Sequence, residues 1–301
     1  MKIKGIFCEA GLFARIILLL GIVSISLILL GVGYSIFYSL ISGESAQNLT
    51  GNPNFMKGSQ LIQSIAIFIL PSLLMAFLIS NHPFRYLDMN RGPNFRNLFL
   101  TIVSMIAIIP AMNLIIEWNE QIRLPESMAT LENWFRSKED LMGETTKLLL
   151  QTDSTGGWIF NLFLVGVVAA ISEEMFFRGI LQNFFLEKWK NPHIAIWLAS
   201  FIFSAIHLQF YGFFPRMLLG AFFGYLLIWT KTLWIPIFAH FINNAIALFQ
   251  FYLEHKGADP QEWMESLQAG GQYLPAIGSL IILGFTIILF KRSSPNSKTA
   301  L

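Results

Sequence analysis

Two adjacent glutamates and an arginine form the most chemically suggestive group in this chain. Glu173 and Glu174 lie in an otherwise apolar stretch, and Arg178 follows Glu174 by four positions. Residues four apart share one face of a helix, and an acid on the N-terminal side of a base is the favourable order for an ion pair. We therefore expect Glu174 to pair with Arg178. Glu173 would then point about 100° away around the helix and be available as a general base.

Two further apolar stretches carry imidazole and amide groups. His207 lies in one of them, and His240 and Asn244, four residues apart, share a helix face on the other. Ionisable groups inside membrane spans cost about 2.5–3.5 kcal/mol each by insertion scales, so their presence calls for a functional reason. Each residue alone could be a packing or hydrogen-bonding group. Taken together, polar positions on three separate apolar segments favour one shared site.

The composition indicates that lipid is the solvent of this protein. Of its 301 residues, 54% are hydrophobic and 13% are charged, whereas soluble domains carry about 25% charged residues. The net charge of +2 gives no indication of a nucleic-acid partner. The single cysteine, Cys8, excludes an intrachain disulfide. The apolar run 16–41 exceeds the roughly 7–15 residues of a signal-peptide core, so we interpret it as a first membrane span.

Apolar runs of the length needed to cross a bilayer, about 20 residues, occur throughout the chain. The predicted spans are 16–41, 61–80, 98–118, 160–186, 193–213, 214–230, 233–252 and 273–290. Backbone groups in lipid must be satisfied within the chain, so the predicted fold is all-α: a polytopic transmembrane bundle of about eight spans with a small extracytoplasmic helical loop. The excess of basic residues on one side predicts cytoplasmic N- and C-termini.

The same pattern predicts four regions. They are N-terminal transmembrane helices (1–120), an amphipathic extramembrane loop (121–156), a catalytic membrane core (157–252), and a final span with a basic tail (253–301). The loop has helical spacing of apolar residues among charges. It could be an amphipathic helix pair lying on the membrane surface, or a lid over a site.

The three polar motifs together resemble the signature of the CPBP family (CAAX protease and bacteriocin-processing) of intramembrane proteases, which is similar to the type II CAAX prenyl endopeptidases. The pattern is Glu-Glu-x-x-x-Arg at 173–178, Phe-x-x-x-His at 203–207 and His-x-x-x-Asn at 240–244. The motifs occur in this order on separate apolar segments. Each alone is weak, and the combination is specific.

This resemblance implies hydrolysis of a peptide bond at membrane depth. The implied catalytic set is Glu173, Glu174, Arg178, His207, His240 and Asn244. In that set the first glutamate activates water, and His207 helps to hold the water. His240 and Asn244 hold the water or stabilise the oxyanion. The pair of Glu174 and Arg178 orients the base. The implied substrate is a membrane-associated or lipidated, CAAX-like protein or peptide.

Metal dependence stays open at the level of sequence. The family is often labelled as metalloproteases, and Glu173, His207 and His240 form a ligand set that zinc accepts while leaving a position for water. The same residues could activate water without a metal. Three other classes of intramembrane protease are excluded by absent motifs. The chain has no His-Glu-x-x-His motif of the site-2 type and no Gly-x-Ser-Gly motif of the rhomboid kind. It also has no aspartate in any predicted span for a presenilin-like dyad, since Asp259 lies in a loop.

Two other functions compete with proteolysis. A non-catalytic membrane scaffold or immunity protein could use the same residues to hold a partner. A proton-coupled transporter could use intramembrane Glu and His as a relay. Transporters usually show repeated halves, but the polar residues here are confined to one half and no repeat is visible.

Overall fold

The computed structural model describes residues 4–44, 49–258 and 273–293, which form helices and no strands. This confirms the predicted all-α class. The chain divides into two compact units, one made of residues 1–91 and 144–195 and the other of residues 92–143 and 196–301. We call them unit 1 and unit 2. Asp259 and the basic tail beyond Ser293 lie outside the described residues.

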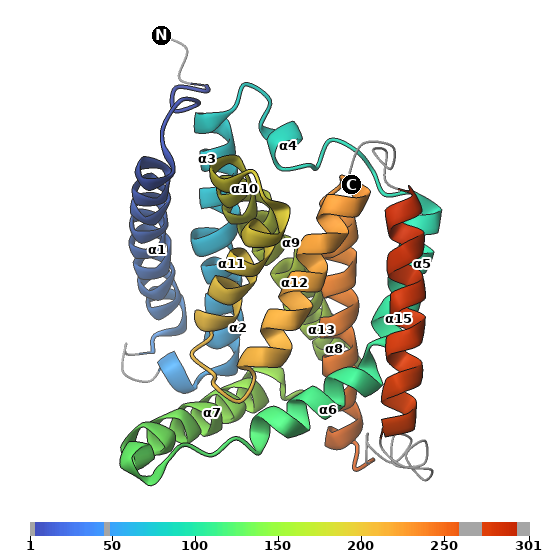
Figure 1. Cartoon of the computed structure of the whole chain (residues 1–301). Coiled ribbons are helices and arrows are strands. Elements are labelled where there is room, and N and C mark those ends of the chain that lie inside the picture. The colour runs from blue at the N-terminus through green and yellow to red at the C-terminus, as the bar shows by residue number, and fades with distance from the viewer. Residues whose placement is uncertain (1–3, 45–48, 259–272, 294–301) are drawn as a thin grey trace. The chain divides into compact units, whose positions relative to one another are not determined.

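Unit 1 contains three long apolar rods (Figure 1). The first is α1 (Leu12–Ser42). The second joins α2 (Pro53–Gln63), the π-helical segment η2 (Ser64–Ile69) and α3 (Leu70–Ile79). The third joins α8 (Thr155–Asn161), η4 (Leu162–Val168), α9 (Ala169–Phe176), η5 (Phe177–Gln182) and α10 (Asn183–Trp189), of which η4 and η5 are π-helical. A 3₁₀ turn, η1 (Leu49–Gly51), and the short α4 (Pro83–Tyr86) complete unit 1.

Local signals set the ends of these rods. Gly43 ends α1 in the left-handed conformation, at φ 70°, which glycine adopts without steric penalty. The side chain of Asn52 accepts hydrogen bonds from the backbone N–H groups of Asn54 and Phe55, and thereby caps α2. The hydroxyl of Ser26 on α1 donates to the carbonyl of Ala66 on η2. This bond ties the first rod to the second, as polar side chains commonly do between membrane helices.

Unit 2 is built from helices of the middle and C-terminal parts of the chain. They are α5 (Phe95–Ala107), α6 (Ile109–Glu120), the 3₁₀ turn η3 (Glu126–Met128), α12 (Phe213–Thr230), α13 (Trp234–His255) and α15 (Tyr273–Ser293). Two helices run across the division: α7 (Ala129–Leu150) begins in unit 2, and α11 (Pro192–Ala205) ends in it.

The core of unit 2 is a cluster of buried apolar side chains from α5, α6, α12, α13 and α15. Its members are Leu100, Met105, Ile108, Met112, Phe222, Phe223, Leu226, Ile235, Ala239 and Phe290. Within the same unit, the hydroxyl of Ser104 on α5 donates to that of Thr286 on α15 at 2.9 Å. Apolar packing and interhelical hydrogen bonds therefore hold the C-terminal helix to α5.

A bend of 43° separates α5 from α6. Pro110 lies at the start of α6, where it has no N–H to donate, and its ring would clash with the preceding turn of a straight helix. The hydroxyl of Ser279 on α15 donates to the carbonyl of Ala107, beside the bend. A neighbouring helix thus hydrogen-bonds a backbone carbonyl at the break. Such hydrogen bonds make bends possible in membrane helices, because they satisfy the backbone groups that the bend leaves unpaired.

Six helices in the described part of the chain are long and apolar enough to cross a membrane, or seven if the bent pair α5 and α6 counts as one span. These helices fit a multi-pass membrane protein. The predicted count of eight is not confirmed, because α11 has 14 residues and is shorter than a typical span. The predicted pair of helices in the loop 121–156 is also wrong: α7 is a single helix of 22 residues.

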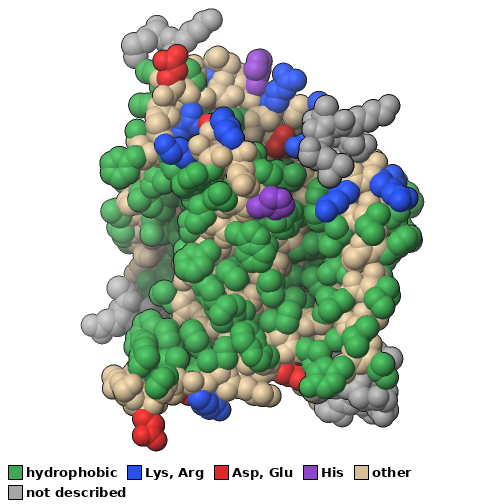
Figure 2. All heavy atoms as spheres, in the orientation of Figure 1, with side chains coloured by type: hydrophobic (Ala, Val, Ile, Leu, Met, Phe, Trp, Pro, Cys, Tyr) green, Lys and Arg blue, Asp and Glu red, His purple; other side chains and the backbone are tan. Residues whose placement is uncertain are grey.

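The visible surface has the character expected of a chain in lipid. Hydrophobic side chains cover the middle of the surface in each unit, and charged side chains gather toward the helix ends (Figure 2). On α1 the outward side chains include Phe13, 78% exposed, and Leu40, 79% exposed. Such fully exposed apolar residues would destabilise a soluble protein, and lipid is the solvent that suits them.

Candidate active site

The acidic motif lies on the third rod of unit 1, at a junction of two helix types. Glu173 and Glu174 belong to α9, and Arg178 is the second residue of the π-helical segment η5. Segments η4 and η5 flank α9 on both sides, and the π-helical η2 of the second rod packs against α9. Such π-helical turns are rare and occur frequently at functional sites.

The predicted ion pair between Glu174 and Arg178 is present. Nη1 of Arg178 donates to Oε1 of Glu174 at 2.9 Å, and both side chains are completely buried. Glu173 differs from its neighbour because it is only partly buried. One glutamate is therefore held in a buried ion pair, while the adjacent one is partly exposed. Neighbouring side chains on a helix point about 100° apart, which is consistent with this difference.

His207 does not lie in a helix, and this corrects the sequence-based expectation that it lies within a fifth span, 193–213. α11 ends at Ala205, and His207 falls in the turn that follows. Leu208 has φ 54°, in the left-handed region that leucine rarely adopts. The turn is held by Ser204, whose hydroxyl donates to the carbonyl of Phe213 at 2.6 Å. Asn119 also holds it, donating to Phe210 O and accepting from the Phe214 N–H.

One hydrogen bond sets the tautomer of His207. Its Nδ1 lies 2.8 Å from the carbonyl oxygen of Phe203. A carbonyl can only accept, so Nδ1 carries the proton and Nε2 presents its lone pair. In this tautomer His207 can accept a hydrogen bond from water through Nε2, which is the geometry required of a residue that holds a nucleophilic water.

The two imidazoles of unit 2 share a phenylalanine. The ring of Phe203 meets His207 edge-on at a centroid distance of 5.3 Å and His240 at 6.0 Å. On the other side, Phe223 of α12 stacks on His240 at 5.3 Å. His240 is 5% exposed. Aromatic packing therefore fixes both imidazoles on one side of unit 2, and sequence reasoning missed the part played by Phe223, one of 29 phenylalanines.

Asn244 is oriented by its neighbour. Nδ2 of Asn243 donates to Oδ1 of Asn244 at 3.3 Å. Since the amide oxygen of Asn244 is turned toward Asn243, its Nδ2 donor end is directed away from that residue. A directed amide donor is the kind of group that stabilises a developing oxyanion. Asn243 itself was not predicted to have a role, although a second polar residue in an apolar span was a visible signal.

The predicted residues thus fall into two sets, one in each unit. Glu173, Glu174 and Arg178 form one set in unit 1. The imidazoles of His207 and His240, joined through Phe203, belong with Asn244 of α13 to unit 2. Among residues 4–44, 49–258 and 273–293, no three His, Cys, Asp or Glu side chains form a group that could hold a metal ion.

Comparison with known proteins places all six candidate residues in one matching region. Residues 155–246 match the family described as type II CAAX prenyl endopeptidase Rce1-like. Over 133 residues the chain is 32% identical to the uncharacterized protein YpbD of Bacillus subtilis (strain 168), covering 43% of this chain and 64% of that protein. It is also 29% identical over 114 residues to the "Putative membrane peptidase YdiL" of the same organism, covering 38% and 46%. The alignments thus span less than two thirds of either relative, and no solved structure matches.

Proposed function

We propose, from the premise that residues 155–246 of this chain are similar to the Rce1-like type II CAAX prenyl endopeptidases, that the protein is an intramembrane endopeptidase. The observation that carries the proposal is the contrast between two adjacent carboxylates. Glu174 forms a buried ion pair with Arg178, whereas Glu173 is only partly buried. This contrast gives the two glutamates separate tasks, one positioning and one catalytic.

In the proposed reaction Glu173 acts as the general base. It takes a proton from water while the water oxygen attacks the carbonyl carbon of the scissile peptide bond. The Nε2 lone pair of His207 accepts a hydrogen bond from that water. His240 and the Nδ2 group of Asn244 stabilise the oxyanion of the tetrahedral intermediate. Glu173 then gives its proton to the departing amine, the carbon–nitrogen bond breaks, and the acid and amine products leave.

Glu174 and Arg178 serve as positioning residues in this account. A carboxylate without solvent or a counter-ion is expensive to bury, so the arginine keeps Glu174 charged and fixed. The fixed pair holds the backbone of α9 at the start of the π-helical turn and thereby sets the direction of Glu173. The proposed substrates are membrane-associated or lipidated, CAAX-like peptides, and the proposed topology has both termini in the cytoplasm.

The experiment is a cleavage assay with purified full-length protein in proteoliposomes. The substrate is a fluorogenic CAAX-like peptide, supplied with and without a lipid anchor. We expect Glu173→Gln to lower kcat by about 10²–10⁴-fold, the contribution of a general base. Glu187→Gln is the matched control, because Glu187 lies on the same rod and binds Arg15 instead. A chelator arm reports on metal dependence.

The outcomes separate the three functional classes. Loss of cleavage in Glu173→Gln, with Glu187→Gln active, supports the protease. A wild-type protein that leaves every peptide intact, while a partner-binding or immunity phenotype survives Glu173→Gln, identifies a scaffold. Proton-coupled flux of a solute that stops in Glu173→Gln, without cleavage, identifies a transporter.

A further inference from the structure

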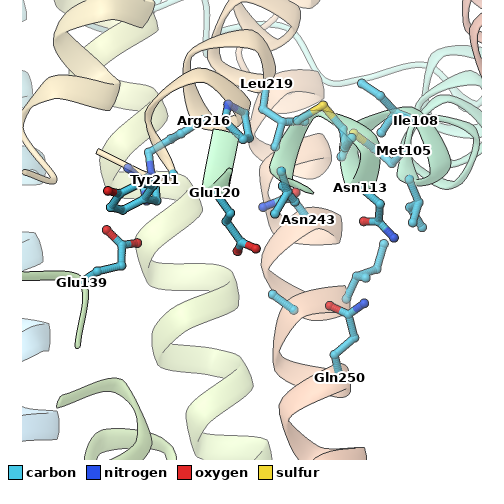
Figure 3. Close-up of a pocket in the computed structure, with 17 residues that line it drawn as sticks. Met105, Ile108, Asn113, Glu120, Glu139, Tyr211, Arg216, Leu219, Asn243 and Gln250 are labelled. Atoms are coloured by element: carbon cyan, nitrogen blue, oxygen red, sulfur yellow. The ribbon is translucent and has the colours of Figure 1, made fainter. Parts of the chain in front are cut away.

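A cavity of about 390 Å³ lies within unit 2, at the bend between α5 and α6 (Figure 3). Its other walls come from the first two turns of α12 and the residues just before them, from the middle and C-terminal half of α13, and from one residue of α7. At the bend near Pro110 the axes of α5 and α6 diverge, and the cavity lies beside this bend. The volume is in the range of roughly 300–1,000 Å³ that is typical of ligand sites.

The cavity combines apolar walls with side-chain amides. Its apolar lining includes Met105, Ile108, Ile109, Met112, Ile116 and Leu219. Asn113, Asn243 and Gln250 also line it. A primary amide both donates and accepts hydrogen bonds, as a peptide unit does. Apolar walls with three such groups match an extended peptide with aliphatic side chains better than they match a lipid tail.

One end of the cavity is lined by charged side chains and the other end by apolar ones. Glu139, Tyr211 and Arg216 gather at one end and Met105 and Ile108 at the other (Figure 3). Nη2 of Arg216 donates to Oε1 of Gln209 at 2.9 Å, and the amide of Gln209 donates to Glu139 at 3.4 Å.

Glu120, an exposed residue at the end of α6, adds a second carboxylate to this lining. The charged lining residues are therefore two carboxylates and one guanidinium, which together carry a net negative charge. Glu120 and Glu139 repel one another electrostatically, and Arg216 attracts Glu139. A cationic group from a ligand would relieve that repulsion.

The cavity is connected to the candidate active site through two adjacent asparagines. Asn243 lines the cavity and donates to the amide oxygen of Asn244. A ligand that hydrogen-bonds Asn243 therefore contacts the residue that orients the proposed oxyanion donor. A peptide held in this cavity would lie along α13 toward Asn244.

We propose that this cavity binds a segment of the peptide substrate that carries a basic side chain, with the lysine or arginine beside Glu139 and Glu120 and aliphatic neighbours against the bent helix. The proposal rests on the proposed protease function, and it adds a substrate preference to it. Asn113, Asn243 and Gln250 would hydrogen-bond the peptide backbone. Gln209 links Arg216 to Glu139 by hydrogen bonds, and the positive charge of Arg216 would repel a second cation.

The test measures binding and cleavage separately. The probes are palmitoylated reporter peptides that share one aliphatic sequence. Each peptide carries lysine, glutamine or glutamate at one position, and this position differs from one group of three peptides to the next. Binding is measured on the cleavage-deficient Glu173→Gln protein in nanodiscs, and cleavage on the protein with Glu173 intact. For at least one position we expect lysine to bind about fivefold more tightly than glutamine, the effect of a partly exposed charge pair of about 1 kcal/mol.

Variants of Glu139 give the decisive comparison. Glu139→Gln should remove the lysine preference, and Glu139→Lys should reverse it in favour of glutamate. Glu144→Gln, an exposed carboxylate farther along α7, is the matched control and should keep the preference. Equal binding of all three peptides at every position, or a lysine preference that survives Glu139→Gln, would overturn the proposal.

The same data separate this proposal from the protease function. Lysine-selective binding that depends on Glu139, in a protein that cleaves nothing, supports the binding site and contradicts the protease. Cleavage without any charge preference supports the protease and contradicts the binding site.

Discussion

Arg178 donates a hydrogen bond to Glu174 across one turn of helix at 2.9 Å, and neither side chain reaches the surface. Breaking this pair would leave an unpaired charge buried away from water, which would destabilise the folded protein. The neighbouring Glu173 differs from Glu174 in burial, because it is partly exposed. The account of function depends on this division between two adjacent glutamates.

The pair makes a prediction about stability. Arg178→Met leaves the Glu174 carboxylate buried without its arginine and should lower the free energy of unfolding by about 3–5 kcal/mol. The double variant Glu174→Leu/Arg178→Met should recover most of that loss, because an apolar pair of similar volume often replaces a buried ion pair at no cost. Thermal unfolding in detergent measures both. A double variant no more stable than Arg178→Met would refute the role of the pair.

His240 makes a prediction that separates packing from chemistry. Its ring stacks on Phe223 and meets Phe203 edge-on, so His240→Phe keeps an aromatic ring in place. This variant should retain the wild-type melting temperature while kcat falls by about 10²-fold or more, the loss expected for one oxyanion-stabilising group. His240→Ala should lose activity and also about 2 kcal/mol of stability. Full activity in His240→Phe would show that only the ring matters.

Leu208 makes a prediction about backbone strain. Its φ of 54° is unfavourable for leucine by roughly 1–2 kcal/mol, and its side chain is 60% exposed, so little packing is lost on truncation. Leu208→Gly should therefore raise the free energy of unfolding by about 1 kcal/mol. Leu208→Ala retains the Cβ atom and should give no such gain. If the alanine variant gains as much as the glycine variant, the turn at His207 is not strained.

Glu139 makes a prediction about pH. Burial raises the pKa of this carboxyl, with smaller contributions of the same sign from Glu120 and Asp140, while Arg216 and the backbone N–H of Tyr211 oppose the rise. The carboxylate is charged above its pKa, so falling pH should abolish the preference for lysine peptides. The loss should begin at a higher pH than for an exposed glutamate, whose pKa is about 4.3.

Binding of the lysine and glutamine peptides across a pH series measures this effect. Glu139→Gln should show no lysine preference at any pH in the series. A preference that persists down to the titration range of an exposed glutamate would contradict the assignment.

The sequence predicted those features that depend on spacing along one helix. The pairing of Glu174 with Arg178 follows from positions four apart in an apolar segment, and the all-α class follows from the demands of lipid. The turn at His207 was missed because residues 193–213 form an almost unbroken apolar run, and only the left-handed Leu208 reveals the break. The π-helical segments beside α9 have no known sequence signal either.

The cavity could not be predicted for a different reason. Glu139 and Arg216 are far apart in the sequence and belong to different helices, so only tertiary packing brings them to one lining. Pro110 is a sequence signal for the bend between α5 and α6. A proline inside an apolar run does not, however, predict which side chains line the space beside the bend. Asn243 was visible as a polar residue in a span, and its contact with Asn244 required the structure.

The most direct test of the central claim is a double-mutant cycle on kcat with Glu173→Gln and His240→Ala, measured in proteoliposomes with a lipidated peptide. Residues that act as one catalytic unit are strongly non-additive, so the combined variant should be about as inactive as Glu173→Gln alone. If the two losses multiply, or if Glu173→Gln cleaves as fast as the wild type, then Glu173 and His240 do not serve one active site.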